Sequence, residues 1–115
     1  MNILVCIKRV PDPTGEVVLT DDGMAVDGRY AGYTTSAHEE AAVAIAVEVA
    51  EATGGQVTVL SVGSEDSVEQ LRSALAVGAH DAVLVEADAD TLGPADVAAA
   101  IAEVITTREA AGTAY

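Results

Sequence analysis

The chain has 115 residues, of which 5 are Lys or Arg and 19 are Asp or Glu, so its formal net charge is −14 at pH 7. This charge argues against sequence-independent binding to nucleic acid or anionic lipid, because both need clustered Lys and Arg. The single cysteine, Cys6, excludes an internal disulfide within one chain. Half of the residues are apolar, without Trp or Phe, so a core of small aliphatic side chains is expected. No targeting or membrane-spanning run is seen, and we expect one domain over residues 1–115 in a soluble, cytoplasmic protein without membrane insertion.

Three short apolar runs predict strands at residues 2–7, 56–62 and 82–86. The runs are continuous and rich in β-branched residues, whereas a half-exposed strand would alternate apolar and polar residues. Continuity indicates strands that are buried on both faces, as in a parallel sheet.

A hairpin is predicted between the first strand and the first helix. Residues 16–19 and 24–27 flank the sequence Thr20-Asp21-Asp22-Gly23, and Asp-Gly between two extended runs is typical of a hairpin turn. Residues 28–35 are expected to form a loop.

The first helix is predicted from Ser36 to Thr53. Ser36 and Glu39 have the spacing of a capping box, and two glycines follow the helix. At 100° per residue the predicted inner face consists of Ala42, Ile45 and Val49. Val43 and Val47 lie off this stripe, so they are expected either as ordinary surface residues or as a contact with another domain.

Two more helices follow the second and third strands. One starts after Ser64 and ends at Gly78, and the other starts at Pro94 and ends at Gly112. The predicted inner faces are Val68, Leu71, Ala74 and Leu75 in the former, and Val97, Ile101, Val104 and Ile105 in the latter.

The order strand, hairpin, helix, strand, helix, strand, helix predicts an α/β fold with three layers, a parallel sheet wrapped by helices. We expect a Rossmann-like topology, similar to that of the adenine-nucleotide-binding α-hydrolase and universal stress proteins, with a short hairpin after the first strand. In such sheets the first strand is central and the ligand lies where strand order reverses beside it. No fourth strand follows in the sequence, so the fold is expected to be incomplete. Either the first strand is an edge covered by the hairpin, or another chain or segment completes the sheet. The chain alone is expected to self-associate or to be marginally stable.

The sequence contains no glycine-rich dinucleotide fingerprint, phosphate loop or zinc-protease motif. The turns after the second and third strands are Gly63-Ser64-Glu65-Asp66 and Glu86-Ala87-Asp88-Ala89-Asp90. Their carboxylates would repel a phosphate at the following helix, although helix N-termini otherwise favour anions. If the fold binds a nucleotide, these residues are therefore expected to hold the adenine and ribose and not the phosphate.

The histidines, the cysteine and the charged residues near the first strand form no recognisable catalytic or metal site. His38 and His80 are expected in solvent-facing turns, and no ligand spacing supports a metal. Cys6 is interpreted either as an inert strand residue or as a ligand contact at the strand end. Lys8 and Arg9 are either solvated or paired with the acidic surface.

Several segments resemble the electron transfer flavoprotein β subunit. They are MNILVCIKRVPDP at residues 1–13, VTVLSVGSEDSVEQLRSALAVGAHDAVLVEA at residues 57–87, and TLGPADVA at residues 91–98. The resemblance covers nearly the whole chain but only the N-terminal half of a family member, which continues into a further strand and a glycine-rich nucleotide loop.

The resemblance implies an electron carrier that is not itself an enzyme. Family members form an α/β heterodimer with FAD held mainly on the α subunit. The heterodimer takes electrons from flavin dehydrogenases and passes them to a respiratory-chain acceptor. The β subunit holds AMP as a structural nucleotide, or a second FAD in some relatives.

Carried over by position, the family's crevice contacts fall on Cys6, on Val62, and on Thr35, Ser36, Ala37 and His38. The last four replace the family's Asn-Pro-aromatic pattern, so the asparagine side-chain contact is lost or replaced. The family's main phosphate loop has no counterpart in these 115 residues.

Two other functions are compatible with the same residues. One is a free-standing adenine-nucleotide-binding regulatory module similar to universal stress proteins. The other is an interaction scaffold without a ligand.

Overall fold

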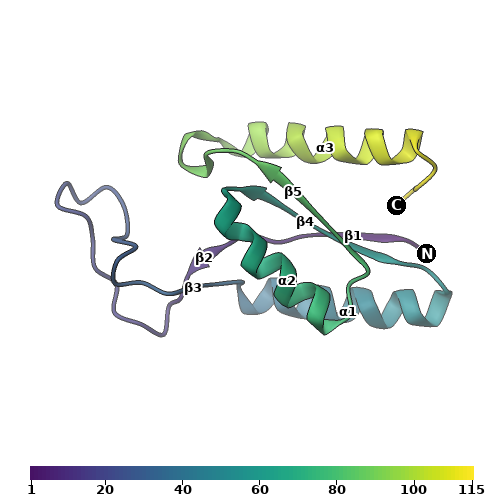
Figure 1. The fold of residues 1–115 in the computed structure, drawn as a ribbon, viewed down its shortest axis with the longest axis horizontal. Coiled ribbons are helices and arrows are strands. Elements are labelled where there is room, and N and C mark those ends of the chain that lie inside the picture. Colours follow the sequence, from purple (N-terminus) through teal and green to yellow (C-terminus); the bar gives the residue numbers. More distant parts are fainter.

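A computed structural model describes residues 1–115, and its centre is a three-stranded parallel sheet (Figure 1). The strands are β1 (Ile3–Cys6), β4 (Val57–Gly63) and β5 (Asp81–Glu86), in the spatial order β1-β4-β5. Both neighbouring pairs are parallel, with Val5 opposite Val59 and Leu60 opposite Val83. The predicted parallel core is therefore confirmed, with each strand within one residue of its expected position.

Helices cover both faces of the sheet, which gives the three expected layers. α1 (Ala37–Thr53) and α2 (Val68–Val77) lie on one face, and α3 (Pro94–Ala110) lies alone on the other (Figure 1). Single 3-10 turns, η1 (Glu65–Ser67) and η2 (Ala89–Thr91), precede α2 and α3. No helix has both the length and the apolar character needed to cross a membrane.

The buried core lies between the sheet and the α1–α2 layer. Its members are Val5, Ile7, Val43, Ala46, Ala50, Val57, Val59, Leu71, Ala74 and Ala79. In α1 the prediction of the inner face was wrong, because Val43 is only 3% exposed whereas Ile45 is 61% exposed. The alanines of α1 lie on every side of the helix. The apolar periodicity therefore did not distinguish the buried stripe with Val43 from the adjacent stripe with Ile45.

Val47, the second valine off the predicted stripe, faces α2. A Cβ atom built on Gly78, the residue that ends α2, would lie 3.0 Å from Cγ1 of Val47. Gly78 also has φ +135°, a conformation that L side chains rarely adopt. Val47 therefore contributes to packing between the two helices and is not a surface residue.

The contact between α3 and the sheet is looser. None of its residues is buried, although Val97 and Ile101 line a cavity against β1 and β4. Near the end of α3, Arg108 forms an ion pair of 2.5 Å with Asp81 at the start of β5. The predicted stripe of α3 therefore faces the sheet, as expected, but does not pack tightly against it.

The excursion between β1 and α1 projects from the carboxyl end of the sheet (Figure 1). β2 (Val10–Pro11) and β3 (Tyr33–Thr34) form a separate antiparallel pair at its base. The predicted strands at 16–19 and 24–27 are reduced to one bridge between Leu19 and Val26. The predicted turn is present, with the amide of Thr20 donating to the carbonyl of Ala25 over 2.9 Å. Since neither strand joins the main sheet, the excursion leaves the outer edge of β1 without a strand partner.

Candidate functional site

The three parallel strands all end at the same edge of the sheet, beside the start of α1 and of α3. In open α/β sheets, ligands bind in the crevice outside the carboxyl ends of the strands. Two cavities open there, with volumes of about 430 Å³ and about 790 Å³. We call them the α3 cavity and the hairpin cavity.

The α3 cavity lies between the sheet and the first turns of α3. Most of its lining is apolar, and the residues are Cys6, Ile7, Lys8, Glu39, Leu60, Val62, Ala89, Leu92, Gly93, Pro94, Val97, Ala98 and Ile101. It brings together two of the expected site residues, Cys6 of β1 and Val62 of β4. An apolar cleft of this size with a few polar groups is typical of a small-molecule site.

Cys6 lines this cavity and is not buried. The residue is exposed as a whole, but packing around its sulfur raises the pKa of the thiol above its ordinary value. The nearby carboxylate of Glu39 raises the pKa further, because a thiolate beside it would be repelled. The thiol is therefore held in its neutral form, which suits a van der Waals contact with a ligand better than nucleophilic chemistry.

The N-terminus of α1 is closed by the predicted capping box. The Ser36 hydroxyl accepts from the amide of Glu39 over 3.3 Å, and the Glu39 carboxylate accepts from the Ser36 amide over 3.3 Å. Through Glu39 this turn reaches the α3 cavity. None of the four expected contacts in this segment, Thr35, Ser36, Ala37 and His38, lines either of the two cavities.

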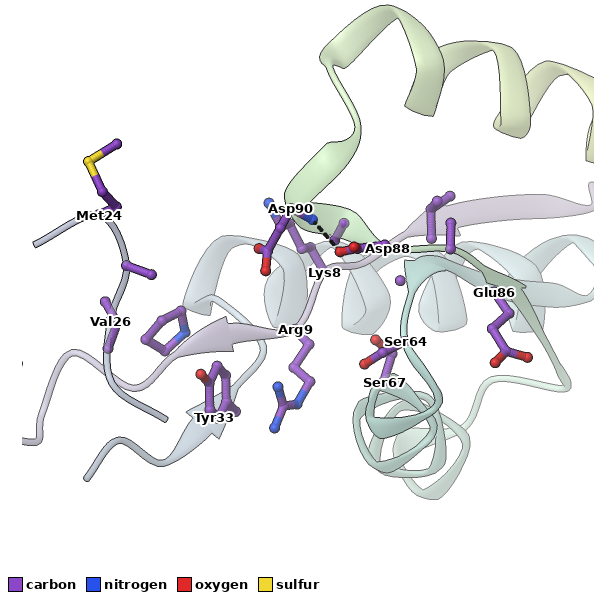
Figure 2. A pocket seen from close by; sticks show the side chains of 16 residues that line it. Lys8, Arg9, Met24, Val26, Tyr33, Ser64, Ser67, Glu86, Asp88 and Asp90 are labelled. Carbon is purple, nitrogen blue, oxygen red and sulfur yellow. Dashed lines mark hydrogen bonds between the residues drawn. The ribbon is translucent and has the colours of Figure 1, made fainter. Parts of the chain in front are cut away.

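The hairpin cavity lies between the projecting excursion and the ends of β4 and β5 (Figure 2). The Arg9 guanidinium stacks on the ring of Tyr33, with its central carbon 3.5 Å from the ring centroid. Its Nε is buried and has no hydrogen-bond partner. Figure 2 shows Arg9 pointing between Tyr33 and the pair Ser64 and Ser67. This arrangement was missed in the sequence, because nothing in the spacing of Arg9 and Tyr33 indicates that β2 and β3 bring them together.

Three carboxylates, all from the turn after β5, line the same cavity and would disfavour a phosphate there. Glu86, Asp88 and Asp90 all line it, as the sequence predicted for the turn after β5. The amide of Asp90 already donates to the side chain of Asp88 over 3.1 Å, so it is not free to bind a phosphate. Arg9 and Lys8 are the two cations in the lining, fewer than the three carboxylates.

The two cavities therefore differ in what they could hold. The apolar walls of the α3 cavity suit a flat base, and the Glu39 carboxylate can accept a hydrogen bond from an amine or a ribose hydroxyl. A phosphate would find Lys8, which lines both cavities, but no glycine-rich cradle of amides. The residues thus fit the adenosine part of a nucleotide and fit its phosphate poorly.

The two histidines lie outside both cavities. His80 is exposed in the turn before β5, as expected, and its Nδ1 accepts from the buried amide of Val57 over 3.0 Å. This histidine therefore stabilises the end of the sheet. The side chains contain no group of three or more potential ligands arranged to hold a metal ion.

Comparison with known proteins gives a consistent family. The sequence pattern of the electron transfer flavoprotein domain matches residues 24–111. The electron transfer flavoprotein subunit beta of Bacillus subtilis is 33% identical over 90 residues, which cover 78% of this chain and 34% of that protein. Protein FixA of Rhizobium meliloti is 34% identical over 109 residues, which cover 90% of this chain and 37% of FixA.

A third relative is the acryloyl-CoA reductase electron transfer subunit gamma of Anaerotignum propionicum. It is 36% identical over 87 residues, covering 76% of this chain and 32% of the relative. The chain therefore spans about a third of the length of the curated relatives it matches. The relatives named as electron transfer flavoprotein subunits are electron carriers and not enzymes.

Proposed function

This chain belongs to the electron transfer flavoprotein family, and we propose that it serves as a β-type subunit of an electron-transferring heterodimer. The observation that carries the proposal is the family match over residues 24–111, on a parallel α/β sheet with an apolar cavity at its carboxyl edge. The partner is an α subunit that holds FAD. The assembly carries electrons from flavin dehydrogenases to a respiratory-chain acceptor.

We propose that the α3 cavity contributes to a site for AMP or a second FAD. Cys6 and Val62 lie against the adenine, and the Glu39 carboxylate accepts from the amine or ribose. The remaining contacts implied by the family resemblance are Thr35, Ser36, Ala37 and His38, at the start of α1 beside Glu39; they line neither cavity themselves. The fit of the apolar lining to a base supports this assignment.

In this proposal the two subunits have different roles in electron transfer. The flavin on the partner supplies the redox chemistry, and the chain itself is an electron-carrier subunit with no catalytic residue. Residues 1–115 form the N-terminal part of a longer nucleotide-binding domain in this proposal, and the protein is cytoplasmic. The shared third of the relatives' length and the single unpaired cysteine support these two points.

Co-production with an FAD-containing α subunit of this family tests the proposal. We expect a complex that survives purification and carries flavin in proportion to the α subunit. A chain that binds adenine nucleotide but never retains the α subunit would favour the regulatory-module function. Failure to retain either would favour a scaffold without a ligand.

A further inference from the structure

The hairpin cavity contains an arginine that has no partner within the chain. The two ion pairs of the chain use Arg29 and Arg108, whereas the Arg9 guanidinium forms none and its buried Nε has no hydrogen-bond partner. Three carboxylates line the same cavity, so acidic groups are not lacking nearby. Stacking on the Tyr33 ring, at 3.5 Å from the centroid, holds the guanidinium in place. A guanidinium that is held in place and left unpaired is suited to an acceptor from outside the chain.

Two serines beside Arg9 also have hydroxyls that the fold does not use. Ser64 and Ser67 stand at the N-cap positions of η1 and α2, and neither side chain caps its helix. Both line the cavity, and Ser67 is only 3% exposed. A Cβ atom on Gly63 would lie 2.9 Å from the Ser67 Oγ, so glycine at this position leaves the space that the hydroxyl occupies. Because Arg9 points between Tyr33 and this pair (Figure 2), the guanidinium and the hydroxyls can donate to one carboxylate.

Acidic groups lie on the other side of the same cavity. Figure 2 shows Asp88 and Asp90 on the side of α3, whereas Arg9 and the two serines lie on the side of α2. Neither of these carboxylates takes part in an ion pair. The cavity has a volume of about 790 Å³, within the range of small-molecule sites. Its two sides therefore present opposite charges to whatever lies between them.

This separation of charge indicates the chemistry of the ligand. A simple anion would be repelled by the three carboxylates of the lining, and a simple cation by Arg9 and Lys8. A molecule with a carboxylate at one end and an ammonium group at the other complements both sides. We propose that the hairpin cavity binds a small zwitterion of the ω-amino acid class, with its carboxylate against Arg9 and the two serines and its ammonium group against Asp88 and Asp90. This site is separate from the nucleotide site proposed for the α3 cavity and does not rest on it.

Titration of the chain, followed by backbone amide shifts in NMR spectra, tests this proposal. The probes are glycine, 4-aminobutanoate and 6-aminohexanoate, each compared with the simple carboxylate and the simple amine of the same chain length. We expect at least one of the three zwitterions to bind about tenfold or more tightly than either of its single-charge counterparts, because it contacts both sides of the cavity. The amides of residues 64–67 and 88–90 should shift together, with one dissociation constant.

Substitutions on the two sides separate the two contacts. Arg9→Gln should weaken the zwitterion by about tenfold or more, whereas Arg72→Gln, the matched control at an exposed position of α2 outside this cavity, should leave binding unchanged. Asp90→Asn alters an exposed side chain, so it decides the question even where Arg9→Gln does not fold. It should weaken the zwitterion and strengthen the simple carboxylate, because it removes an attraction for one and a repulsion for the other.

Three results would overturn the proposal. The first is that none of the zwitterions binds, and the second is that a simple carboxylate or a simple amine binds as tightly as the zwitterion of its length. The third is that the variants do not discriminate, with equal losses in Arg9→Gln and Arg72→Gln or with no change of preference in Asp90→Asn.

Discussion

At the residue scale, His80 lies outside both cavities and stabilises the start of β4 through hydrogen bonds to Val57. Its amide donates to the carbonyl of Val57 over 2.8 Å, and its Nδ1 accepts from the amide of Val57 over 3.0 Å. Val57 itself is fully buried. At the start of β4, the ring nitrogen therefore accepts the hydrogen bond that a backbone carbonyl would accept within a sheet.

Replacing this acceptor tests its contribution. His80→Ala should lower the free energy of unfolding by about 1–3 kcal/mol, because it leaves a buried amide without a partner. His80→Asn should recover most of the loss, since its amide oxygen can occupy the position of Nδ1. Denaturant unfolding of the two variants measures the difference, and equal stability of both would contradict the role assigned to the ring.

Cys6 provides a pH-dependent readout of the α3 cavity. Burial, and then the charge of Glu39, raises the pKa of its thiol. Glu39→Gln removes the charge and keeps the capping box, because glutamine also caps at this position. The pH midpoint of alkylation by iodoacetamide should therefore lie above that of a free cysteine in the wild type, and should move down in Glu39→Gln.

The raised pKa of the Cys6 thiol also makes the stability of the folded state depend on pH. A thiol whose pKa is raised by folding favours the folded state below its unfolded pKa, and this contribution is lost as pH rises through the folded pKa. Alkylation with the midpoint of an unperturbed thiol in the wild type would show that Cys6 does not face a packed cavity next to Glu39.

At the scale of elements, the succession of strands and helices followed from the sequence, but the rotation of α1 did not. Uninterrupted apolar runs identified β1, β4 and β5. Burial on both faces was predicted for all three, but only the central strand β4 is buried along nearly its whole length, and the edge strands β1 and β5 are mostly half-buried. In α1 two apolar stripes lie side by side, one with Val43 and one with Ile45. Only contact with the sheet and with α2 decides between them, and those contacts are not local in sequence.

A pair of alanine substitutions distinguishes the two rotations. Val43→Ala should cost about 2 kcal/mol of unfolding free energy in dilute protein, because it removes two buried methyl groups and leaves a cavity. Ile45→Ala should change it by less than about 0.5 kcal/mol, as expected for an exposed position. The reverse ranking would restore the inner face predicted from periodicity.

At the scale of the whole molecule, part of the candidate site was predictable. Cys6 and Val62 end adjacent parallel strands, so sheet geometry alone brings them to one cavity. The stacking of Arg9 on Tyr33 was not predictable, because it depends on the short β2–β3 pair at the base of the excursion. The carboxylates of the turn after β5 line the hairpin cavity, whereas Glu65 and Asp66 of the turn after β4 do not. That these turns disfavour a phosphate stays a prediction.

Calorimetric titration of the chain with AMP and with adenosine tests the account most directly. If the chain is a β-type subunit that contributes the base and ribose side of a nucleotide site, both ligands should bind more weakly than micromolar. Their affinities should also agree within about tenfold, because the carboxylates of the turn after β5 offset most of the roughly 1.5–3 kcal/mol that a single charge-assisted contact to phosphate contributes. Submicromolar binding of AMP, with adenosine weaker by about a hundredfold or more, would place a phosphate site within these residues and contradict the account.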